Sequence, residues 1–189
     1  MAELNIWQVI SQRTLHDASP WLKLSAEHVR LPNGVEIPDF YRVEMKPYVA
    51  IFALTVDQQV ALIEHYKHGP RQVSLELPAG YIETGDDPLS TAQRELREET
   101  GLASHHWQEL GGFFIDGNRG CGWMYGFLAR EAYLIGAPQL EDTELITLHL
   151  KPLNEVYDSW RTDQIKNAPI MGLIGRALLE IGYLRTTHE

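Results

Sequence analysis

Cysteine is almost absent from the sequence, because Cys121 is the only one among 189 residues. A single thiol cannot form a disulfide within the chain, and such sparing use is typical of proteins in a reducing compartment. No residue near Cys121 in the sequence is suited to activating the thiol, so we assign it no catalytic role. We therefore expect a cytoplasmic protein.

Long hydrophobic runs are missing as well. The longest apolar stretches, such as Val49 to Leu54, are far shorter than the roughly 20 residues that a helix needs to span a bilayer. The segment from Met1 to Gln12 has no basic stretch followed by an apolar one, which a secretory signal would require. We expect no association with a membrane.

Positive charge is scarce. The chain has 16 lysines and arginines against 26 aspartates and glutamates, which gives a formal net charge of −10. A protein that holds nucleic acid through its phosphates needs a basic surface to displace counterions, so we expect no nucleic-acid partner. A small phosphorylated ligand remains compatible with this charge if a divalent cation mediates the contact.

Repeats, low-complexity segments and Gly/Ser-rich linkers are also lacking, so nothing in the composition divides the chain. With 44% hydrophobic residues, a chain of this length can bury one core but is short for two. We expect one main domain with a small appendage.

Short segments rich in β-forming residues and bounded by turn residues predict strands. The first three precede residue 46 and indicate a small antiparallel sheet, with Pro32-Asn33-Gly34 as a hairpin turn. A second hairpin is predicted around Asp57-Gln58. The predicted strands cover residues 21–24, 27–31, 40–44, 49–56, 59–66, 73–77, 107–115, 123–133 and 145–150.

Helix signals are strongest after residue 86. Asp87 suits an N-cap, Pro88 suits the first helical position, and Gly101 lies where a C-terminal cap is expected. A short helix is predicted over residues 153–160, and a last one from Asn167 as cap to about Glu180. This irregular order of strands and helices predicts a layered α/β or α+β domain, without fixing its topology.

Three glutamates of the best-defined helix share one of its faces. Glu95, Glu98 and Glu99 stand at i, i+3 and i+4, so their like charges oppose the helix unless a cation balances them. Hard cations such as Mg²⁺ take carboxylate oxygens, water and phosphate oxygens as ligands. The alternative is a solvated acidic face on which Arg94 and Arg97 pair with neighbouring glutamates.

The segment from Gly80 to Leu102 resembles the signature of the Nudix family. The signature places a glycine, five residues, an acid, seven residues and then Arg-Glu-apolar-x-Glu-Glu-x-Gly-apolar in a loop-helix-loop. Asp86 occupies the acidic position, where the family usually has glutamate. The matching residues are Gly80, Arg94, Glu95, Leu96, Glu98, Glu99, Gly101 and Leu102.

This resemblance implies a metal site and a fold. It assigns Glu95, Glu98, Glu99 and the carbonyl oxygen of Ala79 as ligands of Mg²⁺, with Mn²⁺ as the alternative ion. Arg94 would orient the cluster rather than touch substrate. The implied fold is a mixed sheet sandwiched between helices, which agrees with the order of elements predicted above.

Hydrolysis of a pyrophosphate bond also needs a base that takes a proton from water. In the resembling branch of the family this base comes from an acidic loop well after the signature. We expect Glu144 to be the base, with Glu141 or Asp142 as the alternatives, while a solvated acidic turn is the non-catalytic interpretation. Our catalytic candidates are therefore Glu144, Glu141 and Glu98, of which the last is also a ligand.

The residues from Leu75 to Gly85 resemble the branch that hydrolyses ADP-ribose and nucleoside diphosphate sugars. That branch carries an amino-terminal sheet that helps to form a homodimer, so we expect a β appendage over residues 1–45, a catalytic domain over residues 46–189 and a homodimer. Between Ile115 and Gly126, however, the chain lacks the Ser-Pro-Gly stretch that is common in the branch. The substrate could therefore also be a GDP-sugar, a dinucleoside polyphosphate or coenzyme A, and a nucleotide-sensing module without catalysis is a further alternative.

Three residues are candidates for binding the small nucleotide substrate. Arg71 and Arg119 have planar guanidinium groups suited to phosphate oxygens, and Tyr41 could stack on a base. The alternatives are a surface charge for Arg71, a plain glycine-rich loop around Arg119, and packing for Tyr41.

Overall fold

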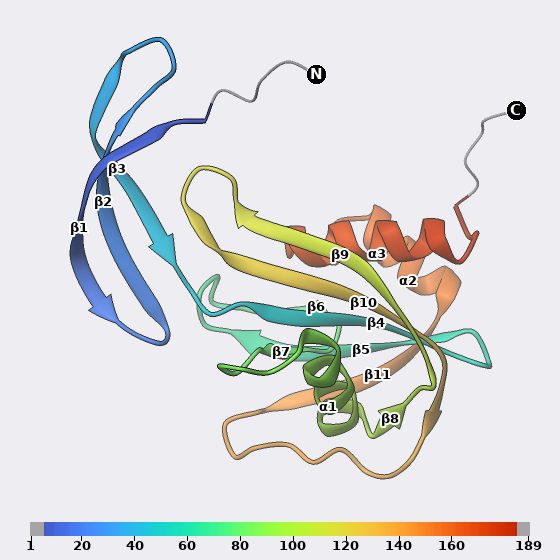
Figure 1. Ribbon diagram of the computed structural model, residues 1–189. Helices are drawn as coiled ribbons and strands as arrows, with labels where there is room; N and C mark the ends of the chain where they lie inside the picture. The colour runs from blue at the N-terminus through green and yellow to red at the C-terminus, as the bar shows by residue number, and fades with distance from the viewer. Residues whose placement is uncertain (1–5, 185–189) are drawn as a thin grey trace, which may run out of the picture. The chain divides into compact units, whose positions relative to one another are not determined.

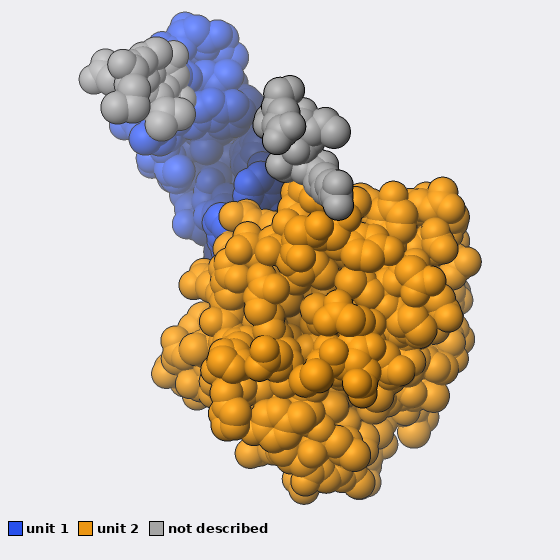
Figure 2. Space-filling model, turned by 90° about the vertical axis from the view of Figure 1, so that its right-hand side faces the viewer, with its two compact units in different colours: residues 1–47, 114–123 blue, residues 48–113, 124–189 orange. Residues whose placement is uncertain are grey.

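The computed structural model describes residues 6–184, which form two compact units. Unit 1 contains residues 6–47 together with Phe114–Trp123, and unit 2 contains Tyr48–Phe113 and the chain from Met124 onward (Figure 2). The sequence predicted a division between residues 45 and 46. It did not anticipate that ten residues from the middle of the chain would belong to the first unit.

Three antiparallel strands build most of unit 1: β1 (Gln8–Ala18), β2 (Leu22–Arg30) and β3 (Glu36–Glu44). The predicted turn between β2 and β3 is present, and the N–H of Gly34 donates a 2.9 Å hydrogen bond to the carbonyl oxygen of Leu31. The predicted antiparallel sheet is therefore confirmed, but the two strands predicted over residues 21–24 and 27–31 form a single strand, β2, and β1 was not predicted.

All residues of the unpredicted strand, β1, are exposed. A strand that buries neither face shows no alternation of apolar and polar residues, so its sequence lacks the usual strand pattern. Apolar side chains at or beside it, Trp7, Val9, Ile10 and Leu15, are exposed. In the described part of the chain, β1 pairs with β2 along one side, which makes it an edge strand of the kind that pairs readily with another chain.

Unit 2 is built on a mixed sheet. Strand β4 runs parallel to β10 and antiparallel to β5 and β7, while β6 and β11 flank β5, and β8 and β9 pair with β10. The short strands β7 and β8 were not predicted. The strands are β4 (Tyr48–Thr55), β5 (Gln59–Lys67), β6 (Gln72–Glu76), β7 (Ala79–Tyr81), β8 (Leu102–Ala103), β9 (His106–Asp116), β10 (Gly120–Leu134) and β11 (Ile146–Pro152). The tip of the β9–β10 hairpin belongs to unit 1, where Gly120 pairs with Val43 of β3.

Helices cover both faces of this sheet. Helix α1 (Pro88–Thr100) lies on one face, and α2 (Leu153–Arg161) and α3 (Ala168–Glu180) lie on the other (Figure 1). Strand β4 is consequently buried on both faces and is almost continuously apolar. This architecture confirms the predicted class, a mixed sheet between helices. None of the helices in residues 6–184 is long and apolar enough to cross a membrane.

The ends of α1 follow the predicted capping residues. The carboxylate of Asp87 accepts a 3.0 Å hydrogen bond from the N–H of Ser90. At the other end Gly101 has a φ of 70°, a left-handed conformation that glycine adopts without strain, and its N–H donates to the carbonyl oxygen of Arg97. These caps fix where the helix with the three glutamates begins and ends.

Candidate active site

Strand β7 lies directly against the acidic face of α1. The N–H of Ala79 donates a 2.8 Å hydrogen bond to Oε2 of Glu99. A Cβ atom at Gly80 would overlap the carboxylate of Glu95, so only glycine allows the backbone to approach this closely. The loop and the helix of the signature therefore meet at two of the predicted ligands.

Arg94 pairs with the other side of the cluster. Its Nη2 lies 2.7 Å from Oε1 of Glu95, and its Nη1 donates a 2.7 Å hydrogen bond to Oε2 of Glu98. Burial works to lower the pKa of Arg94, but the charges of these two glutamates raise it. The predicted role of Arg94, to orient the carboxylates, is consistent with this geometry.

Two of the glutamates are buried, Glu95 with 7% and Glu99 with 5% of its surface exposed. Burial raises the pKa of Glu99 to about 8; the N–H of Ala79 opposes the shift, and the charges of Glu95 and Glu144 add to it. Burial likewise raises the pKa of Glu95, against the influence of Arg94. The positive charge near these two carboxylates therefore does not compensate for the effect of burial on their pKa values.

The donor chemistry of the cluster fits a hard divalent cation, because every candidate ligand is an oxygen and a bound cation would stabilise the ionised form of these buried acids. Within residues 6–184, the present side-chain positions bring no three His, Cys, Asp or Glu residues close enough together to hold an ion. Glu95 and Glu98 are turned toward Arg94, and Glu99 is turned toward Ala79. A cation would have to draw these side chains away from their present partners.

The segment between β10 and β11 is hydrogen-bonded to the C-terminal end of α1. The N–H of Ile135 donates to the carbonyl oxygen of Gly101 at 2.9 Å, and the N–H of Gln139 donates to the carbonyl oxygen of Glu98 at 2.7 Å. A side chain at position 101 would overlap the carbonyl oxygen of Gly136. The signature glycine therefore also lets the acidic loop approach the helix.

The charge of Glu144, which follows this docked segment, contributes to the raised pKa of both Glu95 and Glu99. Glu141 shapes the turn that holds it. The N–H of Glu141 donates to Oε2 of Glu144, and the N–H of Glu144 donates to the carbonyl oxygen of Glu141, both at 2.9 Å. Of the acidic candidates in this loop, Glu144 is the one for which the structure gives an interaction with the cluster.

The predicted substrate-binding residues are divided between the units. Arg71 is exposed in unit 2, in the turn between β5 and β6. Tyr41 and Arg119 belong to unit 1, where Tyr41 is exposed on β3 and the guanidinium of Arg119 lies 6.0 Å from the ring centre of Phe40. Their roles toward a substrate stay predictions.

Sequence reasoning missed a buried ionic cluster around Glu76, the last residue of β6. Glu76 is 4% exposed and accepts hydrogen bonds from Oγ of Ser74 at 2.9 Å and from Nδ2 of Asn167 at 3.4 Å. The Nζ of Lys67 lies 3.5 Å from the same carboxylate. The predicted N-cap residue of α3, Asn167, makes no side-chain capping bond to its own helix. Its amide is directed at Glu76 instead.

The cluster keeps Glu76 ionised and connects it to α1. Burial works to raise the pKa of Glu76, but contact with His65 and the charge of Lys67 outweigh it and lower the pKa to about 2. The His65 Nε2 lies 3.8 Å from Oε2, which is longer than a direct hydrogen bond. Lys67 also lowers the pKa of Glu99 and so carries positive charge toward the acidic face of α1. An acid at a predicted strand position was the only sequence signal for this cluster.

Comparison with known proteins gives matches over both parts of the chain. Residues 45–170 match the model of the NUDIX domain, and residues 7–43 match the model of the nucleoside diphosphate sugar hydrolase N-terminal domain. An ADP-ribose pyrophosphatase from Bacillus subtilis is 28% identical over 73% of this chain and 80% of that protein. A CMP-5'-(N-acetyl-N-hydroxy-3-aminopropyl)phosphonate hydrolase from Streptomyces rubellomurinus is 30% identical over 95% of this chain and 85% of that protein.

Other matches are shorter or concern the fold alone. Two further curated relatives match over only about half of their own length, 48% and 50%. The crystal structure of an ADP compounds hydrolase superimposes with a TM-score of 0.78 over 97% of this chain and 100% of that chain, at 20% identity. This structural likeness supports the predicted fold.

Proposed function

This chain belongs to the Nudix hydrolase family, and on that basis we propose that it hydrolyses the pyrophosphate bond of a nucleoside diphosphate derivative with the help of a divalent cation. The observation that carries the proposal is the docking of the loop with Glu144 onto the helix that holds Glu95 and Glu99. An acidic helix face with no chemical task would not need a fourth carboxylate whose charge acts on two buried ones.

The proposed ligands are Glu95, Glu98, Glu99 and the carbonyl oxygen of Ala79. Bound Mg²⁺, or Mn²⁺ in its place, would neutralise charge on the phosphates and lower the pKa of a water molecule. The chain contributes the placement of the ligands. Glu99 is held by the N–H of Ala79, Glu95 is held against Gly80, and Arg94 holds Glu95 and Glu98 in a common orientation.

We assign Glu144 as the base that accepts a proton from the attacking water. Its backbone is held in a turn by Glu141, and the segment before it is hydrogen-bonded to α1 through Gln139. Glu141 and Asp142 of the same loop are the alternative bases, and Glu98, which is less buried than Glu95 and Glu99, is a further catalytic candidate. Near the same face, the ammonium group of Lys67 would favour an anionic substrate.

ADP-ribose is the leading substrate in this proposal. The name of the Bacillus subtilis relative and the match of residues 7–43 both favour a nucleoside diphosphate sugar. The name of the Streptomyces rubellomurinus relative describes a different substrate, a cytidylyl phosphonate, so other nucleotide derivatives belong in any test. Arg71, Tyr41 and Arg119 are the proposed contacts to the substrate.

We further propose that the protein is a cytoplasmic homodimer, in which residues 1–45 provide the dimer contact. The exposed edge strand β1 and its exposed apolar side chains support this. The single cysteine, Cys121, is in keeping with a reducing compartment.

The decisive test follows product formation from ADP-ribose with Mg²⁺, beside GDP-mannose, diadenosine polyphosphates and coenzyme A, for the parent protein and for Glu99→Gln. We expect AMP and ribose 5-phosphate from the parent and a large loss of rate in the variant. If the parent cleaves none of these compounds but binds one of them, the enzyme proposal is wrong and a sensing module takes its place.

A further inference from the structure

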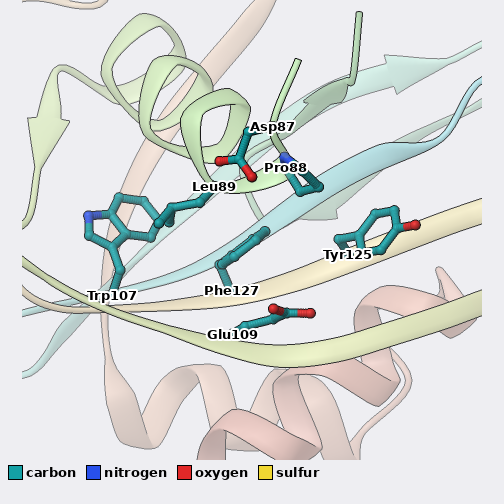
Figure 3. A pocket seen from close by; sticks show the side chains of 7 residues that line it. All are labelled: Asp87, Pro88, Leu89, Trp107, Glu109, Tyr125 and Phe127. Atoms are coloured by element: carbon teal, nitrogen blue, oxygen red, sulfur yellow. The ribbon is translucent and has the colours of Figure 1, made fainter. Parts of the chain in front are cut away.

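Unit 2 contains a pocket whose lining includes none of the residues assigned to the reaction proposed above. A pocket of about 360 Å³ lies between the first turn of α1 and the β9–β10 hairpin (Figure 3). Two residues of β9, Trp107 and Glu109, and two of β10, Tyr125 and Phe127, line it. Residues two apart on a strand point to the same face of the sheet, so these four side chains come together from neighbouring strands.

Three aromatic rings form the walls of this pocket. The rings of Trp107 and Phe127 meet at 73° with their centres 6.4 Å apart, and they form a corner. The indole N–H of Trp107 donates a 2.9 Å hydrogen bond to the carbonyl oxygen of Ser104, which fixes the orientation of the ring. Phe127 is buried in the core cluster, and Tyr125 packs against the same cluster. The walls are therefore held in place before any ligand arrives.

The charged groups that line the pocket are all negative. The residues that line it include two carboxylates, Asp87 and Glu109, and no lysine, arginine or histidine. Asp87 caps α1 and compensates the positive end of the helix. In residues 6–184, no hydrogen-bond or ion-pair partner occupies the carboxylate of Glu109, and Figure 3 shows this side chain among the aromatic rings.

Aromatic faces with an unpaired carboxylate attract cations. The faces of aromatic rings carry negative electrostatic potential, and quaternary ammonium groups are bound in proteins by such combinations. A phosphate or carboxylate ligand would instead meet Glu109 without a compensating cation. We propose that this pocket binds a small organic ammonium cation, held by the rings of Trp107 and Tyr125 and by the charge of Glu109.

The proposal is tested with choline as the probe, by saturation-transfer NMR of its N-methyl resonance and by titration calorimetry on the full chain. Its neutral carbon isostere, dimethylbutanol, has the same shape without the charge. We expect choline to bind and the isostere to bind at least about tenfold more weakly, since the loss of a desolvated cation–π contact costs about this factor.

Variants then locate the binding. Trp107→Leu should weaken choline binding about tenfold, and Glu109→Gln about two- to fivefold, because Glu109 is exposed to solvent. Glu155→Gln, an exposed acid in the first turn of α2, serves as the matched control and should leave binding unchanged. Because Trp107 packs against Phe127, Tyr125→Leu provides a second ring deletion if Trp107→Leu does not fold.

Three results would overturn the proposal. Equal binding of choline and dimethylbutanol would mean that charge plays no part, and the pocket would then be merely apolar. Choline binding that persists at full strength in Glu109→Gln and in both ring variants would place the cation elsewhere. The absence of any binding up to high millimolar choline would also refute it.

Discussion

The α-carbon of Gly80 lies so close to the carboxylate of Glu95 that a methyl group in place of its hydrogen would overlap it. The contact explains in physical terms why the signature begins with glycine. Any side chain at this position must push away one of the proposed metal ligands.

Gly80→Ala should therefore displace Glu95 and lower metal affinity by about 10- to 100-fold, the usual effect of disturbing the support of a ligand. Titration of activity with Mg²⁺ measures this. Gly69→Ala is the matched control, since a Cβ at Gly69 meets nothing within 4 Å. Equal metal affinity in both variants would argue against Glu95 as a ligand.

Glu144→Gln should reduce kcat by about 10²- to 10⁴-fold while KM changes little, because the variant keeps the shape of the side chain and loses the base. Asp142→Asn, in the same exposed loop, should stay within about tenfold of the parent. A severe loss in Asp142→Asn together with a mild one in Glu144→Gln would move the base to Asp142.

Mg²⁺ should stabilise the parent protein against unfolding, by about 2.7 kcal/mol at a free concentration 100 times the dissociation constant. Glu99→Gln should abolish most of this gain, since Glu99 is among the proposed ligands. Without metal, the variant should be at least as stable as the parent at pH 8, because it no longer buries a carboxylate that has little compensating charge. Thermal unfolding with and without Mg²⁺ distinguishes these outcomes, and an unchanged response to Mg²⁺ would remove Glu99 from the ligand set.

The buried Glu76 predicts an acid-sensitive contribution to stability. Its pKa in the folded protein is about 2, below the ordinary value of 4.5, so the ionised carboxylate stabilises the fold above about pH 4.5. That stabilisation is lost as the pH falls toward 2 and amounts to about 3 kcal/mol, from 1.36 kcal/mol per pKa unit.

Urea unfolding of the parent and of Glu76→Gln between pH 2 and pH 6 tests this contribution. The difference in unfolding free energy between the two proteins should shrink as the pH is lowered. Glu64→Gln, a half-exposed acid on β5, is the control and should follow the parent across the range. A difference that stays constant with pH would contradict the low pKa of Glu76.

The proposed dimer predicts a change of mass on disruption of β1. Val9→Glu places a charge on the exposed edge strand and should shift the protein from dimer to monomer in sedimentation experiments. Val56→Glu, at an even more exposed valine between β4 and β5, should not change the mass. A parent protein that sediments as a monomer at micromolar concentration would exclude the proposed arrangement.

Local signals in the sequence predicted much of unit 2. The ends of α1 could be predicted because Asp87 and Gly101 act on backbone groups within a few residues of themselves. The β4–β5 hairpin could be predicted because both strands are rich in β-formers on either side of Asp57-Gln58. The fold class followed from the order of these elements and from the resemblance to the family.

Features that depend on distant residues could not be predicted. Asn167 has the sequence signature of an N-cap, yet its amide is drawn to Glu76, which lies 91 residues earlier. The hydrogen bond from Gln139 to Glu98 and the pocket around Trp107 likewise depend on tertiary packing. Strand β1 was not predicted because it buries neither face and so lacks the alternating pattern of a strand. The roles of Arg71, Tyr41 and Arg119 stay predictions that substrate-binding measurements must decide.

The tip of the β9–β10 hairpin makes the amino-terminal unit impossible to remove cleanly by genetic truncation. The N–H of Val43 is bonded to the carbonyl oxygen of Arg119, and Phe114 packs edge to face on Trp123 within that unit. Deleting residues 1–47 would leave ten residues of hairpin without their β3 partner. We therefore expect that neither unit can be replaced alone by the corresponding unit of a distant relative.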